Sequence, residues 1–258
     1  MKRSLRSTTW LAAVAALALF SFTTARAQGQ RPAAATSKAV APVDLTGYWV
    51  SVISQDWRWR MVTPAKGDYA GVPITAAAKK VADAWDPAND EAAGASCKAY
   101  GAPAIMRTPT RLRVSWQDEN TLKIETDNGT QTRLLHFGAW KPGAAPRSLQ
   151  GDSIAEWHAP RSARGQNNGP RYGSLQVTTK NLLPGYLRKN GVPYSENTTL
   201  QEYFDTFTEP EGTSWLVVTS IITDPMYLTG PYATTNHFKK IPDMQGWDPT
   251  PCRADQPR

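Results

Sequence analysis

Short runs of alternating apolar and polar residues cover most of the chain from Asp44 onward, and turn residues separate them. Alternation with a period of two is typical of strands that bury one face. Only residues 74–85 fit a helix, because Thr75 is a suitable N-cap, an alanine-rich body follows and Asp86-Pro87 ends it. The pattern predicts ten strands, over residues 45–54, 57–62, 111–117, 121–126, 131–137, 148–158, 174–179, 198–207, 215–222 and 232–240.

Ten short antiparallel strands predict an all-β protein with one short helix. A single closed barrel is the expected architecture because closure leaves no strand edge exposed, and a β-sandwich is the alternative. Since no repeat of fixed period and no shift in composition divides the body of the chain, residues 44–258 are assigned to one barrel domain.

The N-terminal residues predict export. Residues 1–27 combine a basic start, an apolar run from Trp10 to Phe22 and the small-residue frame Ala25-Arg26-Ala27, which is typical of a secretory signal peptide cleaved after Ala27. That run is shorter than the roughly 20 residues of a membrane span, so we expect no span in the mature chain. Residues 28–43 lack periodicity and predict a disordered leader. The mature protein is expected in the periplasm or outside the cell.

An exported chain with two cysteines is expected to oxidise them. The sequence therefore predicts a disulfide between Cys97 and Cys252, which would fasten the C-terminal segment to the domain. The alternative is a catalytic thiol that works with one of the three histidines. We favour the disulfide because Cys252 lies close to the chain end.

Alternation also predicts which side chains point into the barrel. Trp49 lies on one face of the first strand, and Trp57 and Trp59 share a face of the second, opposite Arg58 and Arg60. With Trp157 on a later strand, these residues would form an aromatic wall. Such a wall is either core packing or the lining of an internal ligand cavity, which a wide barrel can enclose.

Several motifs resemble those of known barrels. The Gly47-x-Trp49 pattern of the first strand resembles that of lipocalin-like and avidin-like barrels. From Cys97 to Cys252 the chain resembles a set of exported bacterial proteins of undefined activity, with a lipocalin-like (calycin-type) barrel, through Gly101-Ala102-Pro103, Gly151-x-Ser153-x-x-x-Trp157, Leu200-x-Glu202-x-Phe204, Asp224-Pro225 and Thr229-x-Pro231. The resemblance implies a barrel that binds hydrophobic or aromatic molecules, some barrels of this kind being enzymes.

A few charged residues occur on apolar strand faces, where a charge is costly unless it is paired or used. Glu202 lies between Leu200 and Phe204 on one face, and either Arg133 or His136 should point inward from its own strand. Arg133 opposite Glu202 would be a structural ion pair, whereas His136 opposite Glu202 would be an acid–base pair.

Arg107 precedes Thr108-Pro109 at the entrance to a strand. At a barrel mouth, its guanidinium would hold a carboxylate or a phenolate; a surface arginine is the alternative. Without residues 1–27 the chain keeps 25 basic and 22 acidic residues, and this net charge of +3 argues against a nucleic-acid partner. The sequence contains no phosphate-binding loop, nucleotide-binding glycine motif or HExxH, so we expect no cofactor and no metal.

Two functions follow from these observations, and the sequence does not decide whether the protein is an enzyme. The first is an exported barrel that binds a hydrophobic or aromatic small molecule through Trp49, Trp57, Trp59, Trp157, Arg107 and Arg133. The second is a cofactor-free lyase, hydratase or isomerase that uses Glu202 or His136 as its acid or base. Nothing in the sequence indicates an oligomeric state.

Overall fold

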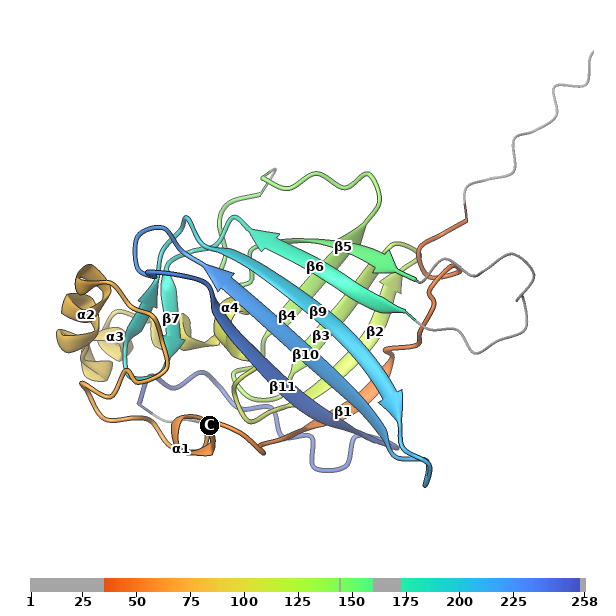
Figure 1. Ribbon diagram of the computed structural model, residues 1–258, viewed down its shortest axis with the longest axis horizontal. Coiled ribbons are helices and arrows are strands. Elements are labelled where there is room, and N and C mark those ends of the chain that lie inside the picture. The colour runs from red at the N-terminus through yellow and green to blue at the C-terminus, as the bar shows by residue number, and fades with distance from the viewer. Residues whose placement is uncertain (1–34, 144, 160–172, 256–258) are drawn as a thin grey trace, which may run out of the picture. The chain divides into compact units, whose positions relative to one another are not determined.

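The computed structural model describes residues 35–143, 145–159 and 173–255, so the predicted signal peptide lies outside the described residues. Nine strands form a closed barrel (Figure 1). Around the barrel, the strands follow the order β1 (Gly47–Val52), β11 (Tyr232–Ile241), β10 (Ser214–Thr223), β9 (Thr199–Thr208), β6 (Ser174–Lys180), β5 (Asp152–His158), β4 (Thr132–Phe137), β3 (Thr121–Thr126) and β2 (Arg111–Asp118), which pairs with β1.

The predicted all-β single barrel is confirmed, with nine strands in place of ten. Eight of the nine neighbouring pairs are antiparallel, but β4 and β5 are parallel. The chain between β4 and β5 therefore returns to the end of the barrel at which β4 starts, a crossover that period-two patterning does not reveal.

The predicted strand over residues 57–62 is wrong. These residues include the one-turn helix α1 (Trp57–Arg60), and Met61 N donates to Trp57 O at 2.8 Å. Asp56 has a left-handed backbone conformation (φ 54°), which ends the extended chain that leaves β1. A single helical turn is too short for its period to be distinguished from alternation.

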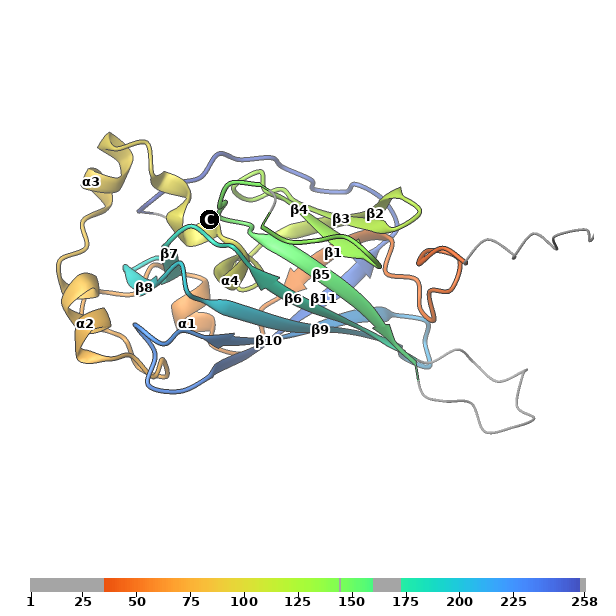
Figure 2. The ribbon, with the colours of Figure 1, turned by 90° about the horizontal axis from the view of Figure 1, so that it is seen from above.

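Short elements gather at one end of the barrel in both Figure 1 and Figure 2. The predicted helix is α2 (Ala76–Asp83), with Thr75 as its N-cap. The other elements at this end are α3 (Pro87–Ala92), the 3₁₀ helix η1 (Ser96–Tyr100), α4 (Ala102–Ile105) and the two-stranded sheet of β7 (Gly185–Arg188) with β8 (Val192–Tyr194).

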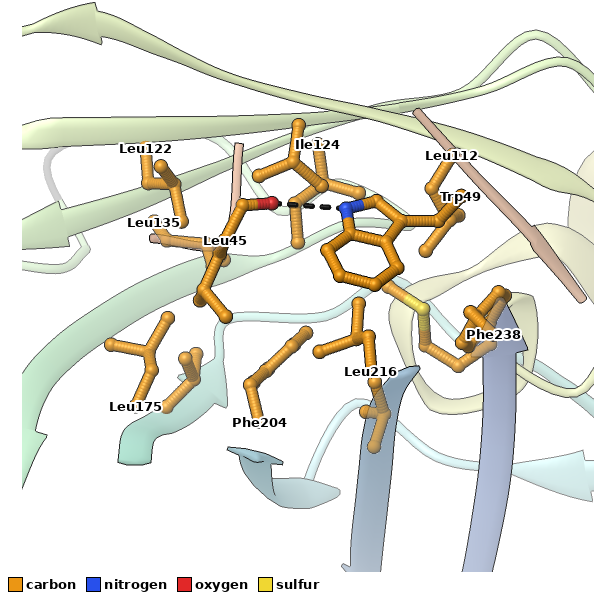
Figure 3. Close-up of a cluster of buried hydrophobic side chains, with 14 of the residues drawn as sticks. Leu45, Trp49, Leu112, Leu122, Ile124, Leu135, Leu175, Phe204, Leu216 and Phe238 are labelled. Atoms are coloured by element: carbon orange, nitrogen blue, oxygen red, sulfur yellow. Dashed lines mark hydrogen bonds between the residues drawn. The ribbon is translucent and has the colours of Figure 1, made fainter. Parts of the chain in front are cut away.

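A cluster of apolar side chains packs together in the barrel interior (Figure 3). Trp49 is fully buried among them, and its indole Nε1 donates to Leu45 O at 3.0 Å. Ile105 and Met106, at the end of α4, close the cluster at the helical end. The aromatic residue of the first strand is thus part of a packed core. The inward-facing strand residues of this cluster are Trp49, Leu112, Val114, Leu122, Ile124, Leu135, Phe137, Ala155, Leu175, Val177, Phe204, Leu216, Val218 and Phe238.

The chain on both sides of the barrel is tied to it. The predicted disulfide is present and joins Cys97 of η1 to Cys252 of the C-terminal segment. Before β1, Val43 packs against the core and Ser37 O accepts a hydrogen bond from the Trp157 indole at 2.9 Å. The sequence predicts that the domain begins at Asp44, but the packed unit begins before that residue.

Candidate functional site

Four cationic side chains line one cavity at the helical end of the barrel. Arg60 comes from the end of α1, Arg107 from the residue after α4's C-cap, Arg188 from the end of β7, and Lys189 follows it. The cavity has a volume of about 30 Å³, which is room for about two water molecules. The other lining residues are Trp59, Val62, Ala99, Ala104, Thr108 and Leu187. We call this the cationic pocket.

Each guanidinium is anchored by one of its nitrogens. Arg60 Nε donates to Arg107 O at 2.8 Å, and Arg188 Nη1 donates to Ala70 O at 2.8 Å. Arg107 Nη1 donates to the Asp56 carboxylate at 3.1 Å. These bonds hold the three groups in place without using all of their donors.

Four of the six remaining guanidinium nitrogens are buried without a hydrogen-bond partner in the described part of the chain. They are Nη1 and Nη2 of Arg60, Nη2 of Arg107 and Nε of Arg188. A buried donor without a partner costs about 1–3 kcal/mol, and more when the group is charged. Four such donors on three neighbouring cations point to an anionic group as the missing acceptor.

The electrostatics of the pocket agree with this interpretation. Burial, and then the nearby Arg107 charge, lower the pKa of Arg60 to about 10. Burial lowers the pKa of Lys189 to about 7, although its Nζ donates to the Tyr100 hydroxyl at 2.8 Å. The Asp56 carboxylate, which pairs with Arg107, is 41% exposed, and Asp255 raises the pKa of Lys189 by less than burial lowers it, so these two acids balance only part of the charge. A bound anion would relieve the repulsion.

The Trp59 ring contacts two arginine side chains through cation–π interactions. The Arg188 guanidinium lies 5.1 Å from the Trp59 ring centroid, and the Arg58 guanidinium lies 4.8 Å from it. Arg58 also pairs with Asp68 at 2.8 Å, and its side chain is 60% exposed. Arg58 is therefore a surface cation beside the pocket, whereas Arg188 is a lining residue that the indole helps to position.

A row of buried polar groups continues from the pocket into the barrel along β11. The Arg107 guanidinium lies 5.9 Å from the ring centroid of Tyr232. The Tyr232 hydroxyl, Thr234 Oγ1 and both amide atoms of Asn236 are buried and have no hydrogen-bond partner among the described residues. These three residues alternate along β11 and face inward, so polar character extends from the rim toward the centre of the barrel.

Arg133 and Glu202 are buried in the barrel interior and form a bidentate ion pair. Arg133 Nη1 donates to Glu202 Oε1 at 3.0 Å, and Nη2 donates to Oε2 at 2.5 Å. Their side chains are 1% and 0% exposed. Of the two arrangements that the sequence leaves open, the structure has the structural ion pair.

His136 points away from Glu202, since its strand buries Arg133, Leu135 and Phe137 on the inward face. The imidazole stacks on Trp140 with ring centroids 4.2 Å apart, and burial lowers its pKa. The structure therefore does not bring the two predicted acid–base residues together.

The four predicted tryptophans do not form one wall. Trp49 is in the core, Trp59 lines the cationic pocket, and Trp57 is 66% exposed because it lies on α1 and not on a barrel strand. Trp157 stacks on Phe137 with centroids 5.3 Å apart, at the end of β5. The wall is absent because it depended on the strand predicted over residues 57–62.

Arg107 is buried and lines the pocket at one end of the barrel. This position agrees with the predicted place at a barrel mouth and not with a surface arginine. Sequence reasoning missed Arg60, Arg188 and Lys189. Alternation assigned Arg60 to an outward face, and Leu187-Arg188-Lys189-Asn190 has the composition of an exposed turn. Arg60 is buried one helical turn after the exposed Trp57, a difference between positions that only the correct period would have revealed.

Among the described residues, no group of three or more His, Cys, Asp or Glu side chains is arranged to bind a metal ion. In the same part of the chain, no helix has the length and apolarity to cross a membrane. Comparisons of the chain with protein-family models, with curated proteins and with solved structures found no match.

Proposed function

We propose that this protein is an exported binding protein that holds a small organic anion in the cationic pocket through the anion's carboxylate. The observation that carries the proposal is the set of four buried guanidinium nitrogens without a partner. Guanidinium groups donate in pairs to the two oxygens of a carboxylate. A cavity of about 30 Å³ has room for such a head group, while the rest of the ligand extends outside.

Export and ligand class rest on the sequence. Residues 1–27 have the features of a signal peptide, and a disulfide is typical of a protein in an oxidising compartment. We therefore propose the periplasm or the cell exterior as its location. The resemblance to lipocalin-like proteins supports a hydrophobic or aromatic ligand, which here would carry its charge into the rim of the barrel.

Binding is a better proposal than catalysis. The lyase, hydratase or isomerase that the sequence suggests uses Glu202 or His136 as its acid or base, and that residue must lie within reach of a ligand. Glu202 is occupied by Arg133, and His136 faces away from the interior.

The test is calorimetric titration of the mature protein with benzoate and with benzamide, its uncharged analogue. Benzoate should bind at one site, and benzamide at least tenfold more weakly because it lacks the charge. Arg60→Met should weaken benzoate binding at least tenfold. Arg58→Met is the matched control from the same helical turn, and it should retain affinity within about twofold since Arg58 is exposed and paired with Asp68. Equal binding of benzoate and benzamide, or equal losses in the two variants, would refute the proposal.

The same titration at pH 6 and pH 8.5 adds a second measurement. The pKa of Lys189 is lowered to about 7, so this amine is charged at pH 6 and neutral at pH 8.5. Benzoate affinity should fall as the pH rises between these values, because the pocket loses one cation. Lys189→Met should remove most of this pH dependence, and a wild-type profile that persists in the variant would assign it to another group.

The thermal stability of the ligand-free protein separates loss of a ligand contact from loss of structure. Arg60 is a desolvated cation beside Arg107, so its replacement by Met should leave the midpoint of unfolding unchanged or raise it. A large fall in that midpoint would mean that Arg60 supports the fold.

A further inference from the structure

An exposed apolar surface adjoins the cationic pocket. Trp57, Met61 and Val62 are 66%, 50% and 56% exposed, whereas Arg60 between them is buried. Trp57 and Met61 lie one helical turn apart on the same face of α1, where Met61 N donates to Trp57 O. Val62 also lines the cationic pocket. We call Trp57, Met61 and Val62 the apolar rim.

The apolar rim is more than scattered surface hydrophobicity. Single exposed apolar side chains are ordinary on a protein surface, but neighbouring ones next to a charged pocket indicate a binding surface. Other large exposed apolar residues of the described chain, such as Phe207 and Met226, come from separate parts of the fold. Among the large exposed apolar residues that the structure describes, only the apolar rim shares a residue with the cationic pocket.

We infer that the ligand is an amphiphilic monocarboxylate whose charged head enters the cationic pocket and whose aliphatic or aromatic body lies on the apolar rim, outside the barrel. This inference rests on the proposed function and adds the ligand's class and its orientation. Two features of the structure support it. The pocket takes no more than a head group, and Val62 belongs both to the pocket lining and to the apolar rim, so the apolar rim is the surface on which the apolar body of a ligand would lie.

The orientation predicts how affinity depends on chain length. A fully buried methylene group improves binding about fourfold. A chain that lies on an open surface is covered on one side, so half of that free energy, or about a twofold gain per methylene, is expected. From butanoate to octanoate, four methylenes should improve affinity about sixteenfold.

The experiment is calorimetric titration of the mature protein with butanoate, hexanoate and octanoate. Trp57→Ser should bind butanoate within about twofold of the wild-type affinity and lose most of the gain with chain length. Phe207→Ser is the matched control, since Phe207 is an aromatic residue of similar exposure, 50%, at the end of β9 remote from α1 (Figure 1). This control should keep the full gain.

The outcomes separate this inference from the proposed function. If butanoate and octanoate bind equally and their binding still requires Arg60, the apolar rim takes no part and only the inference is overturned. It is equally overturned if Trp57→Ser keeps the gain with chain length. If no carboxylate binds, both proposals fail. Sedimentation with phosphatidylglycerol vesicles tests whether a lipid surface is the occupant of the apolar rim. If the protein binds vesicles and octanoate does not displace them, the occupant is a membrane surface and the inference of a soluble amphiphile is overturned.

Discussion

Arg133 and Glu202 form an ion pair inside the barrel, where neither side chain reaches solvent. Thr179 Oγ1 lies 3.4 Å from Arg133 Nη2 and 2.7 Å from Ser153 Oγ, so the pair belongs to a small polar network. An ion pair in such surroundings gains little net free energy, because desolvation offsets attraction. Removal of one partner, however, leaves the other charge buried and uncompensated.

This balance predicts a difference between single and double variants. Glu202→Gln should lower the free energy of unfolding by about 3 kcal/mol or more, while Arg133→Met/Glu202→Leu should recover most of that loss. Urea denaturation followed by circular dichroism measures both values. If the double variant is as unstable as the sum of its two single changes, the polar network is itself required for the fold.

Alternation between Leu200 and Phe204 was enough to place Glu202 inward, and the structure agrees. It was not enough to choose between Arg133 and His136, because Thr132–Phe137 has apolar residues on both faces. The pairing of β4 in the barrel decides between the two residues, because Leu135 and Phe137 face the core and Arg133 lies on the same face. The cationic pocket was beyond sequence reasoning for a related reason, because its residues come from three separate segments.

At the scale of elements, strands with one buried face were predicted well. The predicted strand over residues 121–126 has the same bounds as β3. The prediction was accurate because the apolar residues of this strand lie on one face. The strands β7 and β8 were missed, since they are short and bury nearly all of their residues, which removes alternation. The helix α1 was mistaken for a strand because its sequence, WRWR, alternates over only one turn.

The helix α2 offers a test of a local signal that was predicted correctly. Thr75 Oγ1 accepts a hydrogen bond from Ala78 N at 3.1 Å and donates to Met226 O at 3.1 Å. Thr75→Ala should lower the free energy of unfolding by about 1 kcal/mol, whereas Thr75→Ser, which keeps the hydroxyl, should cost much less. Chemical denaturation gives both values. Equal losses in Ala and Ser variants would assign the effect to the lost methyl group instead of the cap.

At the scale of the whole molecule, the Cys97–Cys252 disulfide closes a loop of 155 residues. Such a closure restricts the unfolded chain and is worth about 5 kcal/mol on loop entropy alone. Cys97→Ser/Cys252→Ser should therefore lower the free energy of unfolding by several kcal/mol in urea denaturation. Wild-type protein unfolded in the presence of dithiothreitol should show a similar loss.

A loss below about 1 kcal/mol would contradict the loop-entropy estimate. The other contacts of the C-terminal segment would then be sufficient to hold it. They include the bridge between Asn128 and Thr250 and the hydrogen bond from Thr130 Oγ1 to Thr250 O at 2.9 Å.

The sequence by itself determined the features that depend on neighbours along the chain. Alternation predicted most of the barrel strands and their inward residues, Thr75 marked the start of a helix, and two cysteines in a chain with the features of export predicted one disulfide. Each of these features follows from local periodicity, local hydrogen bonding or simple chemistry.

Only the tertiary structure decided the parallel pairing of β4 with β5, the choice of Arg133 as the partner of Glu202, and the gathering of Arg60, Arg107, Arg188 and Lys189 around one cavity. These arrangements join side chains from distant segments, whose mutual distances depend on how the barrel closes. Local periodicity records which face of a strand is buried, but it carries no information about which other buried group that face will meet.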